Sequence, residues 1–175
     1  MSQYFCSIVD NALCNPAQRM YFDLGEYRYG LTVVGDGEPI VCLHGFSESS
    51  YTWDAINLPG YRLVRIDLIG HGDSDIPDEE QAYTIPQMIE DLHTVIYHMV
   101  GDRYYLMGYS MGARIALSYA LEYESEIKGI ILESGSVGIA SDDERAKRRK
   151  ADEELAVHIE NHDGAWFATR WAEAP

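Results

Sequence analysis

Residues 108–112, in the second half of the chain, read Gly-Tyr-Ser-Met-Gly. Their types and spacing have the clearest use in catalysis of any run in this sequence. An aromatic and apolar segment, residues 103–107, precedes this run and suits a buried strand, and residues 113–121 follow it and suit a helix. A strand, a tight turn flanked by glycines and a helix form a nucleophile elbow, in which the serine Oγ stands clear of the sheet. The pattern therefore predicts that Ser110 is the catalytic residue of an enzyme.

A second set of residues that could take part in catalysis follows the apolar run of residues 40–43, which suits a short buried strand. His44, Gly45 and Phe46 stand in the loop after that run. Where a nucleophile elbow occurs, this loop supplies one backbone N–H of the oxyanion hole, and the residue after the serine supplies the other. We therefore expect the N–H groups of Phe46 and Met111 to form the hole. His44 precedes the serine in the chain, and we interpret it as a residue that shapes the turn rather than as the base.

The base that would activate Ser110 has no clear candidate in this sequence. In this kind of site the acid and the histidine follow the serine along the chain, each at a rigid position after a strand. The histidines after Ser110 are His158 and His162, which lie in or just beyond a charged helical stretch where we expect exposed residues. We therefore expect the acid and the histidine beyond residue 175, with the C-terminal strands of the sheet and part of a helical lid also absent.

The expected elements alternate from residue 40 onward as strand, helix, strand, helix, strand, helix, strand. Besides the elements around the serine, they include a possible short helix over 51–58, a strand over 61–67, a helix over 85–100 with helical apolar spacing and a strand over 127–132. This alternation predicts an α/β fold with a mostly parallel sheet and helices on both faces.

The chain divides into three expected parts. Residues 1–20 show no clear period and contain Pro16, and we expect a poorly ordered N-terminal arm there. Residues 21–140 carry the strands and helices of the core. From residue 141 the composition changes, and residues 142–154 read as a long charged helix, so residues 141–175 are expected to begin a helical lid.

One glycine-rich segment could be mistaken for a phosphate-binding loop. Residues 70–75 read Gly-His-Gly-Asp-Ser-Asp and follow the strand-like run that ends at Asp67. They lack the lysine of a phosphate-binding loop and the glycine spacing of a dinucleotide-binding loop. We therefore interpret them as a structural turn.

The composition limits the partners of the chain. Lys plus Arg number 13 and Asp plus Glu number 29, and the net charge of −16 opposes binding to nucleic acid or to anionic lipid. No run of about 18 apolar residues predicts a membrane span. The three cysteines, an odd count without C-x-x-C spacing, predict neither a disulfide framework nor a zinc site and fit a reducing cytoplasm. We expect no metal and no other cofactor.

The chain is similar to the α/β-hydrolase superfamily at residues 43–46 (Leu-His-Gly-Phe), at residues 67–74 (Asp-Leu-Ile-Gly-His-Gly-Asp-Ser) and at the elbow. Within the superfamily it resembles the MenH family, the synthases that make 2-succinyl-6-hydroxy-2,4-cyclohexadiene-1-carboxylate in menaquinone biosynthesis. The features that carry this resemblance are Arg114 four residues after the serine, residues 131–139 after the last strand, the basic run 143–152 and Trp171. Ala113 departs from the pattern, because a second glycine often stands there.

The resemblance implies an elimination rather than a hydrolysis: a proton is removed from the ring system of the substrate and pyruvate leaves, with the serine as the base. It also implies substrate-binding roles for Tyr109, Arg114, Arg148 and Trp171. Arginine forks bind carboxylates bidentately, which suits a small anionic substrate with several carboxylates. Arg114 could instead be a polar surface residue of its helix, Arg148 could serve only ion pairs along its own helix, and Trp171 could only pack the lid.

Two other functions remain open at this point. The superfamily hosts many reactions, so an ester or amide hydrolase is one alternative. The other is an inactive module that binds a partner or ligand, which follows if the gene ends at Pro175. Loss of a triad histidine lowers a rate by on the order of a million-fold in a serine protease, so a chain without one would be nearly inert.

Overall fold

The computed structural model describes residues 6–9 and 17–172, and the chain divides into two compact units, residues 1–136 and 137–175. The strands of the first unit are β1 (Cys6–Val9), β2 (Gln18–Asp23), β3 (Arg28–Val34), β4 (Glu38–Leu43), β5 (Tyr61–Ile66), β6 (Tyr104–Tyr109) and β7 (Ile127–Glu133). Its helices are η1 (Ser50–Trp53), η2 (Glu80–Tyr83), α1 (Ile85–Met99), α2 (Met111–Glu122) and η3 (Glu124–Glu126). Among the described residues, no helix has the length and apolar character to cross a membrane.

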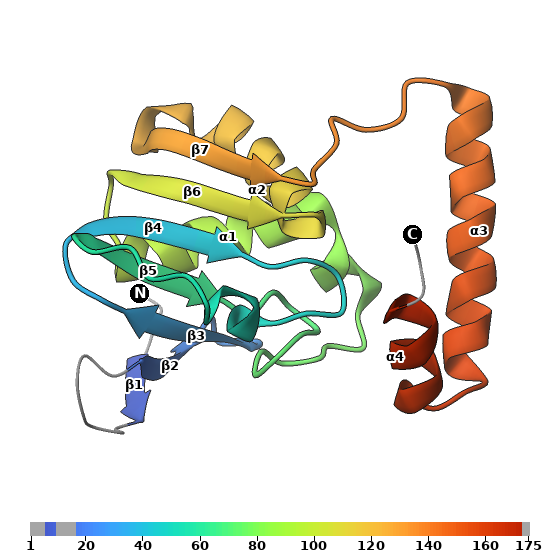
Figure 1. Cartoon of the computed structure of the whole chain (residues 1–175), viewed down its shortest axis with the longest axis horizontal. Helices are drawn as coiled ribbons and strands as arrows, with labels where there is room; N and C mark the ends of the chain where they lie inside the picture. The colour runs from blue at the N-terminus through green and yellow to red at the C-terminus, as the bar shows by residue number, and fades with distance from the viewer. Residues whose placement is uncertain (1–5, 10–16, 173–175) are drawn as a thin grey trace. The chain divides into compact units, whose positions relative to one another are not determined.

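The strands form one sheet in the order β1-β2-β3-β5-β4-β6-β7 (Figure 1). β4 pairs in parallel with both β5 and β6, and β6 pairs in parallel with β7, whereas β1, β2 and β3 pair antiparallel with their neighbours. The prediction of an α/β fold with a mostly parallel sheet is therefore confirmed. Because parallel strands end at the same edge of a sheet, the loops after β4, β5 and β6 meet there, which is where open α/β sheets bind ligands.

The larger core cluster lies between the sheet and the two long helices, α1 and α2, which share one face (Figure 1). Met88, Leu92 and Val95 of α1 recur at helical spacing and are buried in this cluster. Thr84 caps α1, because its side chain accepts a hydrogen bond from the Gln87 N–H at 3.4 Å. This packing fixes α2, and with it the residues that precede its first turn.

The opposite face of the sheet carries a smaller cluster around Trp53 of η1. Helical segments therefore cover both faces, although the segment expected to be helical over 51–58 forms only the single turn of η1. The helix ends where Arg65 of β5 binds the Asp54 carboxylate at 2.7 Å and donates to the Ile56 carbonyl oxygen at 3.3 Å. Cys42 is buried in the same cluster, where it packs as a small apolar residue, and burial raises the pKa of its thiol to about 12.

The sequence suggested a poorly ordered arm over residues 1–20, and the structure describes two strands that lie in or begin in this segment. β1 occupies Cys6–Val9, and β2 already begins at Gln18. The two strands pair antiparallel, and β2 buries Met20 and Phe22 in the larger cluster. Residues 1–5 and 10–16 lie outside the described residues. Local periodicity over so few residues does not reveal these strands, because their partners are other strands.

Asp91 is a buried carboxyl group on α1 that links this helix to β3. Its side chain is 6% exposed and accepts hydrogen bonds from the Tyr29 hydroxyl at 3.1 Å and from the Gln87 amide at 3.0 Å. Burial raises the pKa of Asp91 above its ordinary value of 3.8, although the hydrogen bonds from Gln87 and Tyr29 oppose the shift. The ionised form is therefore less favourable in the folded chain than in the unfolded chain.

Replacement of this carboxyl group should change how stability depends on pH. A folded-state pKa above the unfolded value gives stability that is present below the unfolded pKa and is lost as the pH rises through the folded pKa. We therefore expect the Asp91→Asn protein to gain stability relative to the unchanged protein as the pH rises from below 3.8 to 7. Urea unfolding of both proteins across this range measures the difference, and two parallel curves would contradict the expectation.

The second unit, described by itself, contains α3 (Asp142–Glu160) and α4 (Gly164–Ala172). The long charged helix that the sequence predicts is thus present, and Ser141 caps it by accepting a hydrogen bond from the Glu144 N–H at 3.4 Å. None of the residues of α3 is buried. The rings of His162 and Trp166 stack with their centroids 4.3 Å apart and join the end of α3 to α4.

Candidate active site

Ser110 stands between the end of β6 and the start of α2, with φ 51° and ψ −109°. This left-handed φ is unusual for a residue other than glycine and is held by neighbouring structure, since the Ser110 N–H donates to the Glu133 carbonyl oxygen at 2.8 Å. A Cβ added to Gly108 would stand 2.6 Å from the Gly112 carbonyl carbon, so the turn is closed too tightly for a larger residue at that position. The strand, tight turn and helix predicted around Ser110 are all present.

The loop after β4 packs directly against this turn. A Cβ added to Gly45 would stand 3.0 Å from the Tyr109 ring, and a Cβ on Gly112 would run into the backbone carbonyls at the end of β4. The Gly45 N–H donates to the Glu48 carboxylate at 3.0 Å, which holds the loop in a tight turn. Phe46 in this loop and Met111 at the start of α2 therefore lie on two segments in contact, as a two-donor oxyanion hole requires. Their donor role stays a prediction.

His44 is fully buried beneath this loop, and both of its ring nitrogens have partners. Nδ1 lies 2.8 Å from the Gly45 carbonyl oxygen, and Nε2 accepts a hydrogen bond from the Leu68 N–H at 2.9 Å. This pair of contacts requires the neutral ring with its proton on Nδ1, and burial lowers the pKa of His44 and so favours the neutral form. The interpretation of His44 as a residue that shapes the turn is confirmed, because neither nitrogen is available to serve Ser110.

The side chain of Ser110 has no hydrogen-bond partner among the described residues. The other two histidines considered as bases, His158 and His162, are exposed residues of the second unit, and each ring stacks with Trp166. Within residues 6–9 and 17–172, no cluster of three or more acidic, histidine or cysteine side chains could hold a metal ion. The described residues thus supply the turn and the candidate hole but no base in contact with the serine.

Of the predicted substrate-binding residues, Tyr109 and Arg114 belong to the same unit as Ser110. Tyr109 ends β6, and its ring packs against Gly45. Arg114 lies one helical turn after the serine, and its N–H donates to the Ser110 carbonyl oxygen at 3.3 Å. Its side chain is exposed and forms no ion pair with the described residues. Because Cα–Cβ bonds in a helix tilt toward its N-terminus, the side chain of Arg114 leaves the helix toward the turn that contains Ser110.

The other two predicted substrate-binding residues, Arg148 and Trp171, belong to the second unit. Arg148 on α3 donates from Nε to both carboxylate oxygens of Asp152, at 2.8 and 2.9 Å. This i,i+4 pair is an ion pair along its own helix, the structural alternative that the sequence left open for Arg148. Trp171 on α4 stacks with Phe167 at a centroid distance of 5.5 Å and is 41% exposed. The substrate-binding roles of both residues stay predictions.

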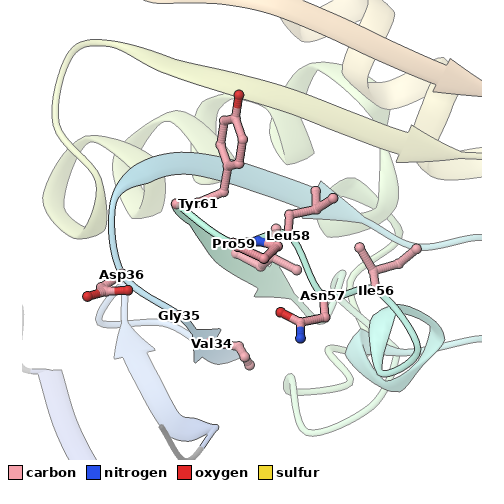
Figure 2. Close-up of a pocket in the computed structure, with 10 residues that line it drawn as sticks. Val34, Gly35, Asp36, Ile56, Asn57, Leu58, Pro59 and Tyr61 are labelled. Carbon is pink, nitrogen blue, oxygen red and sulfur yellow. The ribbon is translucent and has the colours of Figure 1, made fainter.

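A small cavity of about 60 Å³ lies elsewhere in the first unit (Figure 2). It is lined by the turn between β3 and β4, residues 34–36, and by residues 56–61 with Leu63. These residues stand near the amino ends of β4 and β5, whereas Ser110 follows the carboxyl end of β6. The cavity is therefore not part of the candidate active site.

The sequence interpretation missed a buried ion pair beside the carboxyl end of β5. Asp67 directly follows β5 and is fully buried, and Arg19 of β2 binds its carboxylate at 3.0 Å. The residues 70–75 fold around this carboxylate, since a Cβ on Gly72 would collide with it, and so form the structural turn that the sequence predicts. An acidic residue at the end of a buried strand was a signal for Asp67, but no local pattern marks Arg19.

The comparisons with known proteins agree with this geometry. Residues 38–172 match the family model of the alpha/beta hydrolase fold. The chain is 34% identical over 152 residues to a putative 2-succinyl-6-hydroxy-2,4-cyclohexadiene-1-carboxylate synthase of Bacillus subtilis (strain 168), covering 85% of this chain and 56% of that protein. It is 33% identical over 135 residues to the synthase of the same name from Enterobacter sp. (strain 638), covering 73% of this chain and 51% of that protein. The chain thus spans about half the length of the curated relatives that it matches.

Solved structures of other activities are also similar. A thioesterase domain from the curacin biosynthetic pathway superposes with a TM-score of 0.68 at 26% identity, over 79% of this chain and 53% of that one. A Vigna radiata epoxide hydrolase mutant superposes with a TM-score of 0.62 at 26% identity, over 66% of this chain and 38% of that one. The same fold therefore occurs in proteins whose names describe different reactions.

Proposed function

The chain belongs to the alpha/beta hydrolase fold family, and on that premise we propose that its protein is a lyase that eliminates pyruvate to form 2-succinyl-6-hydroxy-2,4-cyclohexadiene-1-carboxylate in menaquinone biosynthesis. The observation that carries the proposal is the similarity of most of this chain to synthases with that product in their names. In this reaction a base removes a proton from the ring system of the substrate, and the bond to the pyruvate group breaks.

The candidate site offers a role for each of its parts in such an elimination. Ser110 removes the proton, in a relay completed by a histidine and an acid that the described residues do not supply. The N–H groups of Phe46 and Met111 stabilise the negative charge that develops on the substrate. Arg114 attracts a carboxylate of the substrate, which matters more in a chain with a net charge of −16 because most of its surface repels anions.

Pyruvate release tests the proposal. The full-length protein is incubated with the pathway precursor that still carries the pyruvate group, and the pyruvate formed is reduced by lactate dehydrogenase while the loss of NADH is followed by absorbance. The proposal predicts turnover that depends on Ser110. Turnover of a simple aryl ester without any pyruvate release would contradict it.

A hydrolase of esters or thioesters is the second candidate function. The observation that favours it is the structural similarity to a thioesterase domain at a TM-score of 0.68. In that reaction Ser110 attacks a carbonyl carbon and forms an acyl-enzyme, so an initial burst of the leaving group is expected. The lyase forms no acyl-enzyme, and burst kinetics with an aryl ester therefore separates the two candidates.

Substitution of Arg114 should weaken substrate binding if the lyase proposal is right. Arg114→Gln removes a charge-assisted hydrogen bond worth about 1.5–3 kcal/mol, so we expect KM for the precursor to rise on the order of 10- to 100-fold. Arg114→Lys keeps the charge but loses the planar fork, and a smaller rise is expected. Initial rates of pyruvate release at varied precursor concentration measure both effects, and an unchanged KM in Arg114→Gln would show that this side chain does not bind the substrate.

A further inference from the structure

The carboxylate of Asp67 lies at the centre of a buried network between β5 and the two loops beside the candidate site. Its Oδ1 accepts the Ser50 N–H at 2.6 Å, and its Oδ2 accepts the Asp73 N–H at 3.1 Å. The hydroxyl of Ser74 also donates to the Asp67 carbonyl oxygen at 2.6 Å. One fully buried carboxylate thereby fixes the backbone at the start of η1 and within the turn of residues 70–75.

Arg19 supplies the positive charge for this carboxylate and reaches it across a neighbouring strand. β3 lies between β2 and β5 in the sheet, and the Arg19 guanidinium donates to Thr32 of β3 at 3.3 Å as well as to Asp67 at 3.0 Å. The same group pairs with Asp73 and lies 5.2 Å from the centre of the Tyr51 ring. Arg19 therefore contacts the residue that follows β5, the turn of residues 70–75 and η1 at once.

The loop that carries Phe46 is held at both ends by the residues that follow β5. At its beginning, the His44 ring accepts the Leu68 N–H at 2.9 Å. At its end, the Ser50 N–H binds the Asp67 carboxylate. Between these anchors Ser47 has a left-handed φ of 63°, so the loop is held in a conformation that it would not favour by itself. A donor of an oxyanion hole must stay within about 0.5 Å of its place, and the two anchors limit how far the loop can move.

We propose that Arg19 is a positioning residue for this loop: its contacts with Asp67 and Asp73 hold the carboxylate in place, the carboxylate holds the Ser50 N–H, and this end of the loop fixes the N–H of Phe46. The proposal rests on the proposed function for the identity of the hole. Arg19 touches no reacting atom in this scheme. Through Arg19, strand β2 helps to hold the candidate site in place, although two other strands separate β2 from β4.

Amide hydrogen exchange tests the positioning step without any assay of activity. In Arg19→Met, we expect the Ser50 and Asp73 amides to exchange at least about tenfold faster than in the unchanged protein, while the amides of β4 and β6 keep their rates, because only a local opening is made easier. Arg28→Met is the matched control, since Arg28 of β3 pairs with Asp75 at 3.1 Å in the same turn but does not contact Asp67. Unchanged rates at Ser50 and Asp73, or equally faster exchange throughout the sheet, would overturn the proposal.

Kinetics of pyruvate release tests the consequence for the site. A loop displaced by about 1 Å can lower a rate on the order of 100-fold, so we expect Arg19→Met to lower kcat by about 10- to 100-fold with KM changed less than about threefold. Arg19→Lys, which keeps the charge but loses the planar fork, should recover part of kcat and part of the Ser50 protection. A KM effect with kcat unchanged would overturn the positioning role. If the unchanged protein releases no pyruvate, the proposed function fails, and the exchange rates at Ser50 alone then decide whether Arg19 positions the loop.

Discussion

Replacement of Ser110 by alanine is expected to lower the rate of pyruvate release by about 10²- to 10⁴-fold in the full-length protein, the usual contribution of one positioned proton-transfer group. KM should change little, because the hydroxyl is small and the contacts proposed to bind the substrate lie on other residues. The turn itself should persist, since its conformation depends on the two glycines and on the hydrogen bond from the Ser110 N–H to Glu133 rather than on the hydroxyl. Single-turnover rates at saturating precursor measure the effect.

The size of this loss also distinguishes the two candidate reactions. A hydrolase in which Ser110 is the nucleophile should lose on the order of 10⁶-fold, because the covalent intermediate can no longer form. Ser118→Ala is a suitable control, since Ser118 lies on the same helix and its hydroxyl donates to the Arg114 carbonyl oxygen at 3.1 Å. If Ser110→Ala and Ser118→Ala had equal rates, Ser110 would have no part in the chemistry.

The turn around Ser110 could be predicted from the sequence because all of its determinants are local. The apolar strand, the two glycines and the amphipathic helix are consecutive, and each leaves its own periodic or compositional pattern. The parallel sheet followed from the alternation of such segments, as did the helix that begins after Thr84. The role of His44 followed from its place before the serine, and the structure adds the two hydrogen bonds that explain it.

The contacts that hold the loops of the candidate site in place could not be predicted, because they join segments that are distant in the sequence. Arg19 and Asp67 are 48 positions apart, and Arg19 stands in a stretch without an apolar period. The length of the helix at η1 was likewise overestimated, because Arg65 of β5 binds the residues that directly follow this turn. In each case a charged side chain finds its partner only when the sheet has formed, and no spacing along the chain records that pairing.

Replacement of Gly112 by alanine is expected to destabilise the first unit by about 1–3 kcal/mol or more, the usual cost of forcing a methyl group into a filled space. The added Cβ would collide with the carbonyl oxygen of Leu43 and stand 2.5 Å from that of His44. Both are backbone atoms at the end of β4, so no side-chain rotation can relieve the overlap, and α2 or the loop of Phe46 must move. For a protein of this size the melting temperature should fall by about 2–4 °C per kcal/mol.

Gly129→Ala is the matched control for this substitution. A Cβ at Gly129 of β7 would meet only the Tyr105 ring at 3.4 and 3.5 Å, which is ordinary van der Waals contact, so the melting temperature should change little. Equal melting temperatures for Gly112→Ala and the unchanged protein, measured by calorimetry, would contradict the close approach of α2 to β4. Since this approach sets the distance between Met111 and the loop of Phe46, the stability lost in Gly112→Ala measures how firmly the two candidate donors are held together, whichever reaction the site performs.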